Sequence, residues 1–401
     1  MTRPSVEVVV VGGGPAGLTA AIALAGAGVA TALVAGRPRE ADNRTTALLT
    51  GSVTALETLD VWRRCRAQAA PLRVIRIVDD TGRLLRAPEV RFEADEIGLP
   101  AFGYNIENRP LLAAMMERTR ELSALTLVSE DAQEISIGPQ AVTVRLDSGD
   151  SILGRLAIGA DGRRSRCRAA AGIETERWRY PQAALTFTLG HGRPHQDIST
   201  EFHTETGPFT LVPLPGLRSS LVFVTDPEEA AHAAALRAPE LAAEIERRSH
   251  SILGKIEVEP DHGVFPLAVE RARLFGARRV ALVGEAAHVI PPIGAQGLNL
   301  GLRDAASIGE LAVAAQRAGR DIGGINVLAA YDKMRRADIG SRLLAVDLLN
   351  RTLLTDFLPV QGARGLGLYL LDRIGPLRRA LMREGVTPTS AQPRLMRGET
   401  L

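Results

Sequence analysis

The chain has 401 residues, of which 45% are apolar and 23% are charged, and this length and composition indicate a globular protein with two interlocked domains. The 48 basic and 46 acidic residues leave a net charge of +2, so we expect no nucleic-acid partner. With two cysteines, no CxxC pair and no apolar stretch of roughly 20 residues, we expect no disulfide framework, no metal site and no membrane-spanning helix, and a cytoplasmic location.

The N-terminal region has the pattern of a strand, a glycine-rich turn, a helix and a second strand. The run VEVVVV is typical of a central parallel strand, and Gly12, Gly14 and Gly17 follow it at GxGxxG spacing, with Ala16 in the same turn. Such glycines permit a tight turn, close approach of the backbone to a pyrophosphate, and close packing of helix on strand. The pattern therefore predicts the opening unit of a dinucleotide-binding α/β fold.

The second strand departs from that pattern. It ends in Ala35 and Gly36, where the fold normally carries a carboxylate that holds the ribose hydroxyls. Arg37 follows, and an arginine there favours the 2′-phosphate of NADP, so an NADP-dependent dehydrogenase is one interpretation of this first motif. In the other interpretation, backbone groups or water alone hold the adenosine end of the nucleotide.

The following segments alternate between helical and strand-like patterns. We expect a loop leading into a helix over residues 44–62, a second helix over 108–122, and a β-meander over 125–153. The stretch GADGRRSRCR comes after a further strand. Its Asp161 either caps the helix that follows or has a role at a ligand.

The second half of the chain contains a sheet-forming region and then helices. Strand-like pieces between residues 176 and 267, around a helical stretch at 230–249, indicate an antiparallel sheet with a cover helix, inserted into the first domain. The stretch LVGEAAHVIPPIGAQGLNLGLRDAA has the pattern of a buried strand, a Gly/Pro-rich loop and a helix, with Glu285 at the strand tip. Such a loop presents free backbone N–H groups to a ligand with negative or polar oxygens. Beyond Asp304 the pattern is mostly helical.

In this order, GxGxxG, GADGxxSxxR and GxAAHxxxPxxxQGxNxGxxD resemble the class A flavin-dependent monooxygenases, the p-hydroxybenzoate-hydroxylase-like aromatic hydroxylases, over about residues 5–350. Within that superfamily, GPFTLVPLPG, FPLAVERARLFGARRVALVGEAAH and LLNRTLL look most like the ubiquinone-biosynthesis hydroxylases. The resemblance implies an α/β fold with a Rossmann-like FAD-binding domain, an inserted antiparallel β-sheet substrate domain and a helical C-terminus. The implied ranges are 1–70, 100–175 and 270–330 for FAD binding, 71–99 and 176–269 for substrate, and 331–401 for the C-terminal region.

The resemblance also implies one bound FAD and the residues that hold it. The implied cofactor-binding residues are Gly12, Gly14, Ala16, Gly17, Arg44, Arg109, Asp161, Glu285, Pro292, Gly297, Leu298 and Asn299. Asp161 and the two arginines belong to the pyrophosphate side, and Glu285 to a ribityl hydroxyl. The backbone N–H groups of residues 297–299 would face the N1–C2 edge of the flavin, where a helix N-terminus favours negative charge.

Three positions in the third motif depart from the family pattern. Glu285 occupies the position of the usual aspartate, Pro291 that of a His-like residue, and Ala295 that of the first glycine of "GQG". The longer stem of Glu285 requires the loop to shift if the ribityl contact is kept. Flavin binding is expected, and the three departures leave the geometry of the loop open.

The implied chemistry is monooxygenation. NADH or NADPH reduces the flavin, O₂ adds to the reduced ring, and the resulting hydroperoxide transfers an oxygen atom to the aromatic ring of a polyprenylated phenol in ubiquinone biosynthesis. The scheme requires no catalytic side chain, and none is assigned; His288 is expected to support the loop.

The substrate of the ubiquinone branch is hydrophobic, so a surface that contacts a membrane would help the enzyme reach it, and the C-terminal region is a candidate for that surface. Its apolar residues, with Arg378, Arg379 and Arg383, could contact a membrane surface or a biosynthetic complex, or could pack on the core or on a partner subunit. Two alternative functions are a flavin hydroxylase of a small soluble phenol and a non-catalytic FAD-binding component of a biosynthetic complex.

Overall fold

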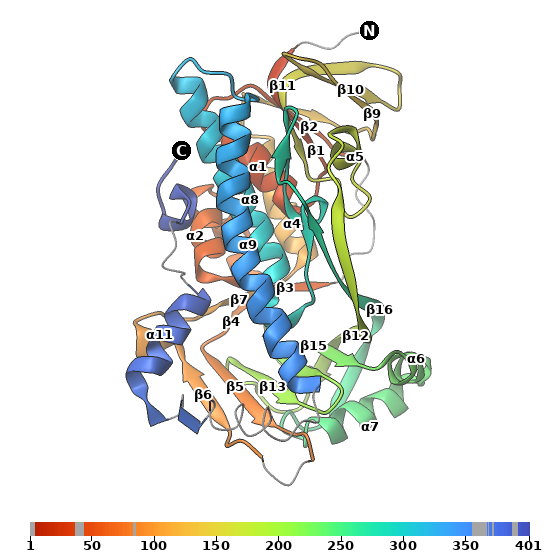
Figure 1. The fold of residues 1–401 in the computed structure, drawn as a ribbon. Helices are drawn as coiled ribbons and strands as arrows, with labels where there is room; N and C mark the ends of the chain where they lie inside the picture. The colour runs from red at the N-terminus through yellow and green to blue at the C-terminus, as the bar shows by residue number, and fades with distance from the viewer. Residues whose placement is uncertain are drawn as a thin grey trace.

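Two large β-sheets are joined by a small one (Figure 1). The computed structural model describes residues 5–36, 44–82, 86–354, 367, 369–370, 373–386 and 392–401. The first sheet has the strand order β17-β18-β11-β1-β2-β8, with β10 and β9 continuing from β11. The second has the order β19-β16-β12-β15-β14-β13-β5-β6, and the small sheet has the order β3-β7-β4.

The first sheet is built around parallel strands buried on both faces. Its strands are β1 (Val6–Val11), β2 (Thr31–Val34), β8 (Leu125–Val128), β9 (Ala132–Ile137), β10 (Val142–Leu146), β11 (Ser151–Gly159), β17 (Gly276–Ala277) and β18 (Val280–Leu282). β1 runs parallel to β2 and β11, and β11 runs parallel to β18. Because parallel sheets are covered on both sides, the valines at 8, 9 and 10 are fully buried. This sheet confirms the predicted α/β class.

Two local predictions in this region are wrong. Residues 45–49 form strand β3 (Thr45–Leu49), not a loop, and they pair with β7 (Gly103–Glu107). β8 is not part of a meander, because it pairs in parallel with β2, whereas β9, β10 and β11 do form antiparallel neighbours. In both cases the partner strand lies far away in the sequence, where local patterning carries no information about it.

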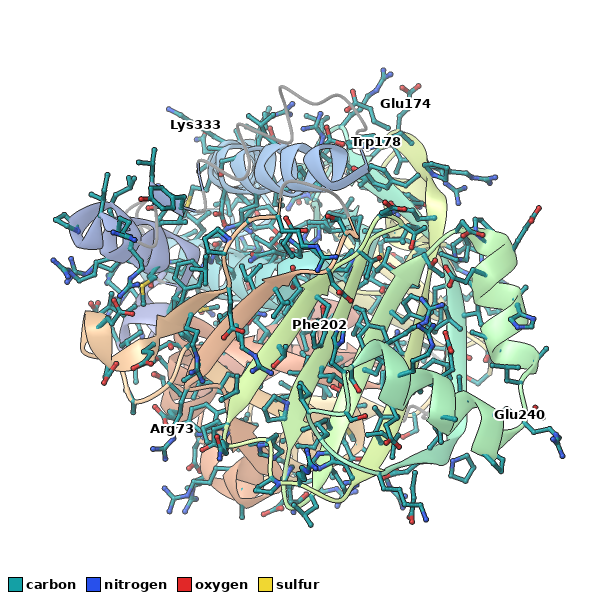
Figure 2. All side chains as sticks on the ribbon, turned by 90° about the horizontal axis from the view of Figure 1, so that it is seen from below. Arg73, Glu174, Trp178, Phe202, Glu240 and Lys333 are labelled. Carbon is teal, nitrogen blue, oxygen red and sulfur yellow. The ribbon has the colours of Figure 1, made fainter. Side chains whose placement is uncertain are left out.

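The second sheet is antiparallel except at one pair. Its strands are β5 (Val74–Asp79), β6 (Val90–Glu93), β12 (Thr175–His191), β13 (Ile198–His203), β14 (Pro208–Leu214), β15 (Arg218–Thr225), β16 (Ile256–Ala272) and β19 (His288–Val289). The exception is the parallel pair β13 and β5, which brings residues from two distant segments into one sheet. Figure 2 looks onto this sheet, with Phe202 near its middle and Glu240 on a cover helix.

The cover of this sheet is two helices, not the single stretch predicted. α6 (Pro227–Ala235) and α7 (Ala238–Arg248) each have a proline in the first turn, which favours a new helix start there. Leu241 and Ile245 of α7 share one apolar cluster with Phe187 and Phe209 of the sheet.

Most of the remaining helices pack around the first sheet, whereas α11 packs against β6 at the edge of the second (Figure 1). They are α1 (Pro15–Gly26), α2 (Thr50–Thr58), α3 (Trp62–Cys65), α4 (Asn108–Thr119), α5 (Arg166–Ala170), α8 (Gln296–Arg317), α9 (Ile325–Leu354) and α11 (Gly375–Val386). Strand β4 (Ala69–Pro71) and the 3₁₀ turns η1 (Arg66–Gln68), η2 (Ala94–Ile97), η3 (Gly284–Ala286), η4 (Ile293–Ala295) and η5 (Arg394–Arg397) complete the elements. Among the described residues, no helix has both the length and the apolar character to cross a bilayer.

Candidate cofactor site

The glycine turn after β1 leaves open space at the start of α1. Gly12 has a φ of +118°, and an added Cβ would lie 2.5 Å from the carbonyl carbon of Ala160. A Cβ at Gly17 would overlap the Gly12 carbonyl oxygen and lie 2.9 Å from the Ala160 side chain. At Gly14, by contrast, an added Cβ meets nothing within 4 Å. Two glycines therefore permit close packing, and Gly14 borders free space next to the unpaired N–H groups of the first turn of α1.

The first and third motifs meet through small residues. A Cβ at Gly301 of α8 would lie 3.1 Å from the Cα of Gly284 and 3.4 Å from the Cβ of Ala16. A Cβ at Gly284 would also lie 3.1 Å from the Cβ of Ala16. Because these residues carry little or no side chain, the first turn of α1 packs directly on η3 and the first turns of α8. The structure thus brings two helix N-termini close together, and both suit a ligand with negative oxygens.

The loop before α8 has an unusual backbone. Ala295, at the position where the family pattern has glycine, adopts the left-handed conformation with φ +54° and ψ +32°. Pro292 is exposed at the start of η4, and Gly297 borders free space. The loop therefore reaches the conformation that glycine would give it, at the energetic cost of a left-handed alanine.

The first turn of α8 is fixed by the side chain of Asn299. Its amide nitrogen donates to the carbonyl oxygens of Ala47 (2.8 Å) and Ala295 (2.6 Å), and its oxygen accepts from the Leu49 N–H (2.8 Å). The side chain is therefore committed to β3 and the loop. What residues 297 and 298 offer to a ligand is their backbone N–H groups, which lack partners within the helix, whereas the N–H of residue 299 faces the N-cap carbonyl of Ala295.

Asp161 acts on the helix that follows it. Its carboxylate accepts from the Ser165 hydroxyl (2.5 Å) and from the backbone N–H groups of Arg166 (2.7 Å) and Cys167 (3.1 Å). The structure thus supports the capping interpretation of this residue, and its role at a ligand stays a prediction.

The second and third motifs are tied together by Arg168, the last residue of GADGxxSxxR. It donates to the carbonyl oxygens of Ala286 (2.8 Å) and Arg163 (2.6 Å). Glu285 lies beside this tie, with its side chain 53% exposed and its carboxylate 3.6 Å from Nε of Arg163. The longer acid is thus accessible at the carboxyl end of β18. Sequence reasoning alone gives Arg168 no role, although its place as the last residue of GADGxxSxxR marks it.

Arg44 and Arg109 lie at the same end of the small sheet. Thr45 pairs with Glu107 across β3 and β7, and the Asn108 N–H donates to the Arg44 carbonyl (2.8 Å). Both arginines are exposed. Two arginines therefore lie near the strand that Asn299 fixes. Arg37, on which the NADP interpretation rests, is outside the described residues.

A buried charged network supports the loop from behind. Asp304, fully buried on α8, accepts from the Gly284 N–H (2.9 Å), from Nε of Arg335 (2.6 Å) and is bonded to Nε2 of His288 (2.7 Å). Arg335 also donates from Nη1 to the carboxylate of Asp338 (2.7 Å), and both residues lie on α9. His288 therefore supports the loop, as expected, and its buried ring cannot reach a ligand.

The electrostatics of this network favour the charged forms. Burial alone would raise the pKa of Asp304, but the Arg335 guanidinium and His288 outweigh it and lower that pKa. In the same way, three arginines overcome burial and lower the pKa of Asp338 to about 2. The site therefore combines a buried charged network behind the loop with exposed polar groups in front of it.

We predict that Ala295→Gly stabilises the protein, since glycine removes the cost of a left-handed alanine. The expected gain in the free energy of unfolding in urea is about 1 kcal/mol. The matched control is Ala314→Gly at an exposed position of α8, where the same change should lose about 1 kcal/mol. A loss of stability in Ala295→Gly would contradict the assigned backbone conformation.

We predict that Asp338→Asn lowers stability in a pH-dependent way. The folded pKa of about 2, against an ordinary value of 3.8, means that the carboxylate stabilises the fold above about pH 4 and loses that effect as the pH falls toward 2. In urea, the free energy of unfolding of the variant should be about 2 kcal/mol lower than that of the wild type at pH 7. This difference should become smaller below pH 4. Glu134→Gln, in an exposed ion pair, is the control and should change stability little. A difference that does not vary with pH would argue against the role of this carboxylate.

Comparison with known proteins is consistent with this geometry. The family model described as an FAD binding domain matches residues 5–344. The chain is 36% identical to the ubiquinone hydroxylase UbiL of Rhodospirillum rubrum, over 98% of this chain and 93% of that protein. It is 30% identical to the 3-demethoxyubiquinol 3-hydroxylase of Escherichia coli K12, over 96% of this chain and 99% of that protein.

A solved structure shares the fold. The p-nitrophenol 4-monooxygenase PnpA of Pseudomonas putida DLL-E4 superposes with a TM-score of 0.79 at 19% identity, covering 97% of this chain and all of that one. The family match and the two relatives cover nearly the whole chain. The chain therefore belongs to the class A FAD-dependent monooxygenase family, where it groups with the ubiquinone hydroxylases.

Proposed function

We propose that this chain binds one FAD and hydroxylates the aromatic ring of a polyprenylated phenol in ubiquinone biosynthesis, with NADH or NADPH and O₂ as co-substrates. The observation that carries the proposal is its similarity to a ubiquinone hydroxylase along 98% of the chain. In the overall reaction, a ring C–H becomes C–OH, NAD(P)H is oxidised, and the second oxygen atom of O₂ leaves as water.

The residues at the site fit FAD. The space beside Gly14 would take the pyrophosphate, because the absence of a side chain there permits close backbone approach, and Gly12, Ala16 and Gly17 permit the tight turn and close packing around it. Arg44 and Arg109 would pair with phosphate oxygens, and Asp161 would hold its turn in place. When bound, FAD would supply the redox and oxygen-transfer chemistry.

The third motif would hold the flavin end. Glu285 is exposed and can accept from a ribityl hydroxyl, and Pro292 would border the ring. The N–H groups of residues 297 and 298 would stabilise negative charge on the pyrimidine edge, because they sit at the N-terminus of a 22-residue helix. We assign FAD binding to residues 1–70, 100–175 and 270–330, and substrate binding to 71–99 and 176–269.

The junction of the sheets is the proposed place of the substrate ring. Asn299 bonds the start of α8 to β3, and β3 pairs with β7. Asn105 of β7 donates to the Pro213 carbonyl (2.9 Å) and the Ser220 hydroxyl (3.1 Å) of the second sheet. A ring bound there would lie between the flavin end of the site and the large sheet, where surrounding side chains exclude water.

The C-terminal helix is the proposed contact with the membrane surface. Met382 and Val386 of α11 are buried in a cluster with Phe92 of β6, so one face of the helix is anchored. Leu377 and Leu381 on the other face of α11, and Leu370 and Ile374 before the helix, are between 38% and 51% exposed. Arg379 and Arg383 lie in the same segment as Arg373, so this face suits an anionic bilayer surface. Arg378, the third arginine expected at this contact, instead donates to the Glu96 carboxylate (2.9 Å).

We predict that Gly14→Glu folds but does not retain FAD. The added side chain enters the open space, and its charge opposes the phosphates. The visible flavin absorbance of the purified protein should fall from about one FAD per chain to none. Gly26→Glu, the same change at the exposed far end of α1, is the control, because an added Cβ there also meets nothing within 4 Å, and it should keep flavin. Normal flavin loading in Gly14→Glu would contradict the site assignment.

The reaction itself is tested with the FAD-loaded protein, NAD(P)H, O₂ and a polyprenylated phenol. A product heavier by one oxygen atom supports the proposal. Turnover only with small soluble phenols would favour the alternative hydroxylase. Bound FAD with no NAD(P)H oxidation in the presence of any phenol would favour a non-catalytic component.

We predict that the double change Leu377→Glu and Leu381→Glu reduces cosedimentation with vesicles of phosphatidylcholine and phosphatidylglycerol by roughly tenfold. The control is Leu217→Glu, which alters a comparably exposed leucine (49%) before β15 and should have no effect. Equal vesicle binding by the double variant would exclude this face as the membrane contact.

A further inference from the structure

The end of β2 lacks the acid that this fold uses to hold the ribose. Ala35 and Gly36 stand there, and neither can accept a hydrogen bond through its side chain. The φ of Gly36 lies outside the left-handed region, so the backbone would accept any residue. The reason for glycine at this position must therefore be space.

That space is occupied by a carboxylate from another segment. A Cβ added to Gly36 would overlap Oδ1 of Asp131 and would lie 2.5 Å from its Cγ and 2.8 Å from its Oδ2. The Asp131 carboxylate thus sits where the side chain of an acid at residue 36 would begin. A side chain at 36 and the carboxylate of Asp131 exclude each other.

The sheet explains how Asp131 reaches this point. β8 runs parallel to β2, with Val128 beside Val34, and the Ala35 N–H donates to the Val128 carbonyl (2.9 Å). Asp131 follows β8 by three residues, so it emerges at the same carboxyl edge as the end of β2. The Asp147 N–H donates to its carbonyl (3.2 Å), which fixes its backbone.

The same edge carries the glycine turn. A Cβ at Gly13 would lie 2.7 Å from the Cβ of Ala35, so the end of β2 packs against the turn whose Gly14 borders free space. The Asp131 side chain is exposed to solvent at this edge. A charged acceptor is thus available beside the proposed pyrophosphate position, on the side of the neighbouring strand.

We propose that Asp131 is the residue that accepts hydrogen bonds from the adenosine ribose hydroxyls of the bound nucleotide, in place of the acid missing from β2. The inference rests on the proposed FAD function. A carboxylate there also disfavours a 2′-phosphate by charge repulsion, which argues against the NADP interpretation of the first motif. Gly36 is the complementary part of the arrangement, because it leaves room for Asp131.

The test measures FAD affinity of the apoprotein by quenching of flavin fluorescence. Asp131→Ala should weaken FAD binding roughly tenfold, the effect expected for hydrogen bonds to a charged acceptor. Glu134→Ala, which removes an exposed carboxylate of β9, is the matched control and should bind like the wild type. The melting temperature of the apoprotein should be the same in all three.

Two further measurements distinguish the loss of ribose recognition from a general weakening of FAD binding. The 2′-deoxyadenosine analogue of FAD should bind the wild type roughly tenfold less tightly than FAD, whereas Asp131→Ala should bind both alike. Gly36→Glu in the Asp131→Ala background should recover FAD affinity. Gly36→Glu alone should lose FAD affinity, because the new glutamate side chain and the Asp131 carboxylate would occupy the same space.

Unchanged FAD affinity in Asp131→Ala, or equal discrimination between FAD and its analogue in wild type and variant, would overturn the inference and leave the proposed function standing. A wild-type protein that takes up no FAD would instead overturn the proposed function itself. These outcomes are distinguishable because the wild-type titration precedes the others.

Discussion

The buried carboxylate of Asp304 is the interaction on which the candidate site depends. It is fully buried, and a buried charge is tolerated only when partners and hydrogen bonds surround it. Its partners come from η3, from β19 and from α9, so one side chain joins the strand tip, the loop and the long C-terminal helix. The ligand-facing side of the loop can remain exposed because the Asp304 network holds the loop from its buried side. Removal of either Arg335 or Asp304 would leave an uncompensated charge in the core, the change that such networks tolerate least.

Small residues permit the close packing of helices on which the site also depends. Ala16, Gly284 and Gly301 allow α1, η3 and α8 to approach so closely that two helix N-termini open onto the same region. Neither helix has an acidic residue in its first turn or a side-chain cap at its start. The positive ends of both helices are therefore left for a ligand, which is the arrangement expected where a nucleotide supplies the negative groups.

The parts of this molecule that could be predicted from the sequence are those encoded by short-range patterns. The glycine turn after β1, the helical pattern beyond Asp304 and the supporting role of His288 follow from motifs that fit within a few turns of chain. The strand nature of 45–49, the pairing of β8 with β2 and the parallel contact of β13 with β5 could not be foreseen, because their partners lie in other segments. Asp304 lies inside a recognised motif, but Arg335 lies outside the three motifs. Likewise, Gly36 could be recognised as a missing acid, whereas only the fold reveals that Asp131 fills its space.

The discontinuous first sheet also sets the order in which the protein can mature during synthesis. β1 can pair with β11 only after β11 has been synthesised. In turn, β11 can pair with β18 only after the chain has reached Leu282, the last residue of β18. The helix that supplies the second N-terminus begins only at residue 296, and the arginine that neutralises its buried acid lies at residue 335. Because a ribosome adds residues in sequence, the nascent chain would hold an incomplete, apolar sheet edge until most of it has emerged. We therefore expect cofactor capture to be a post-synthetic event, in which flavin binds a chain whose first sheet is already complete and stabilises it by mass action.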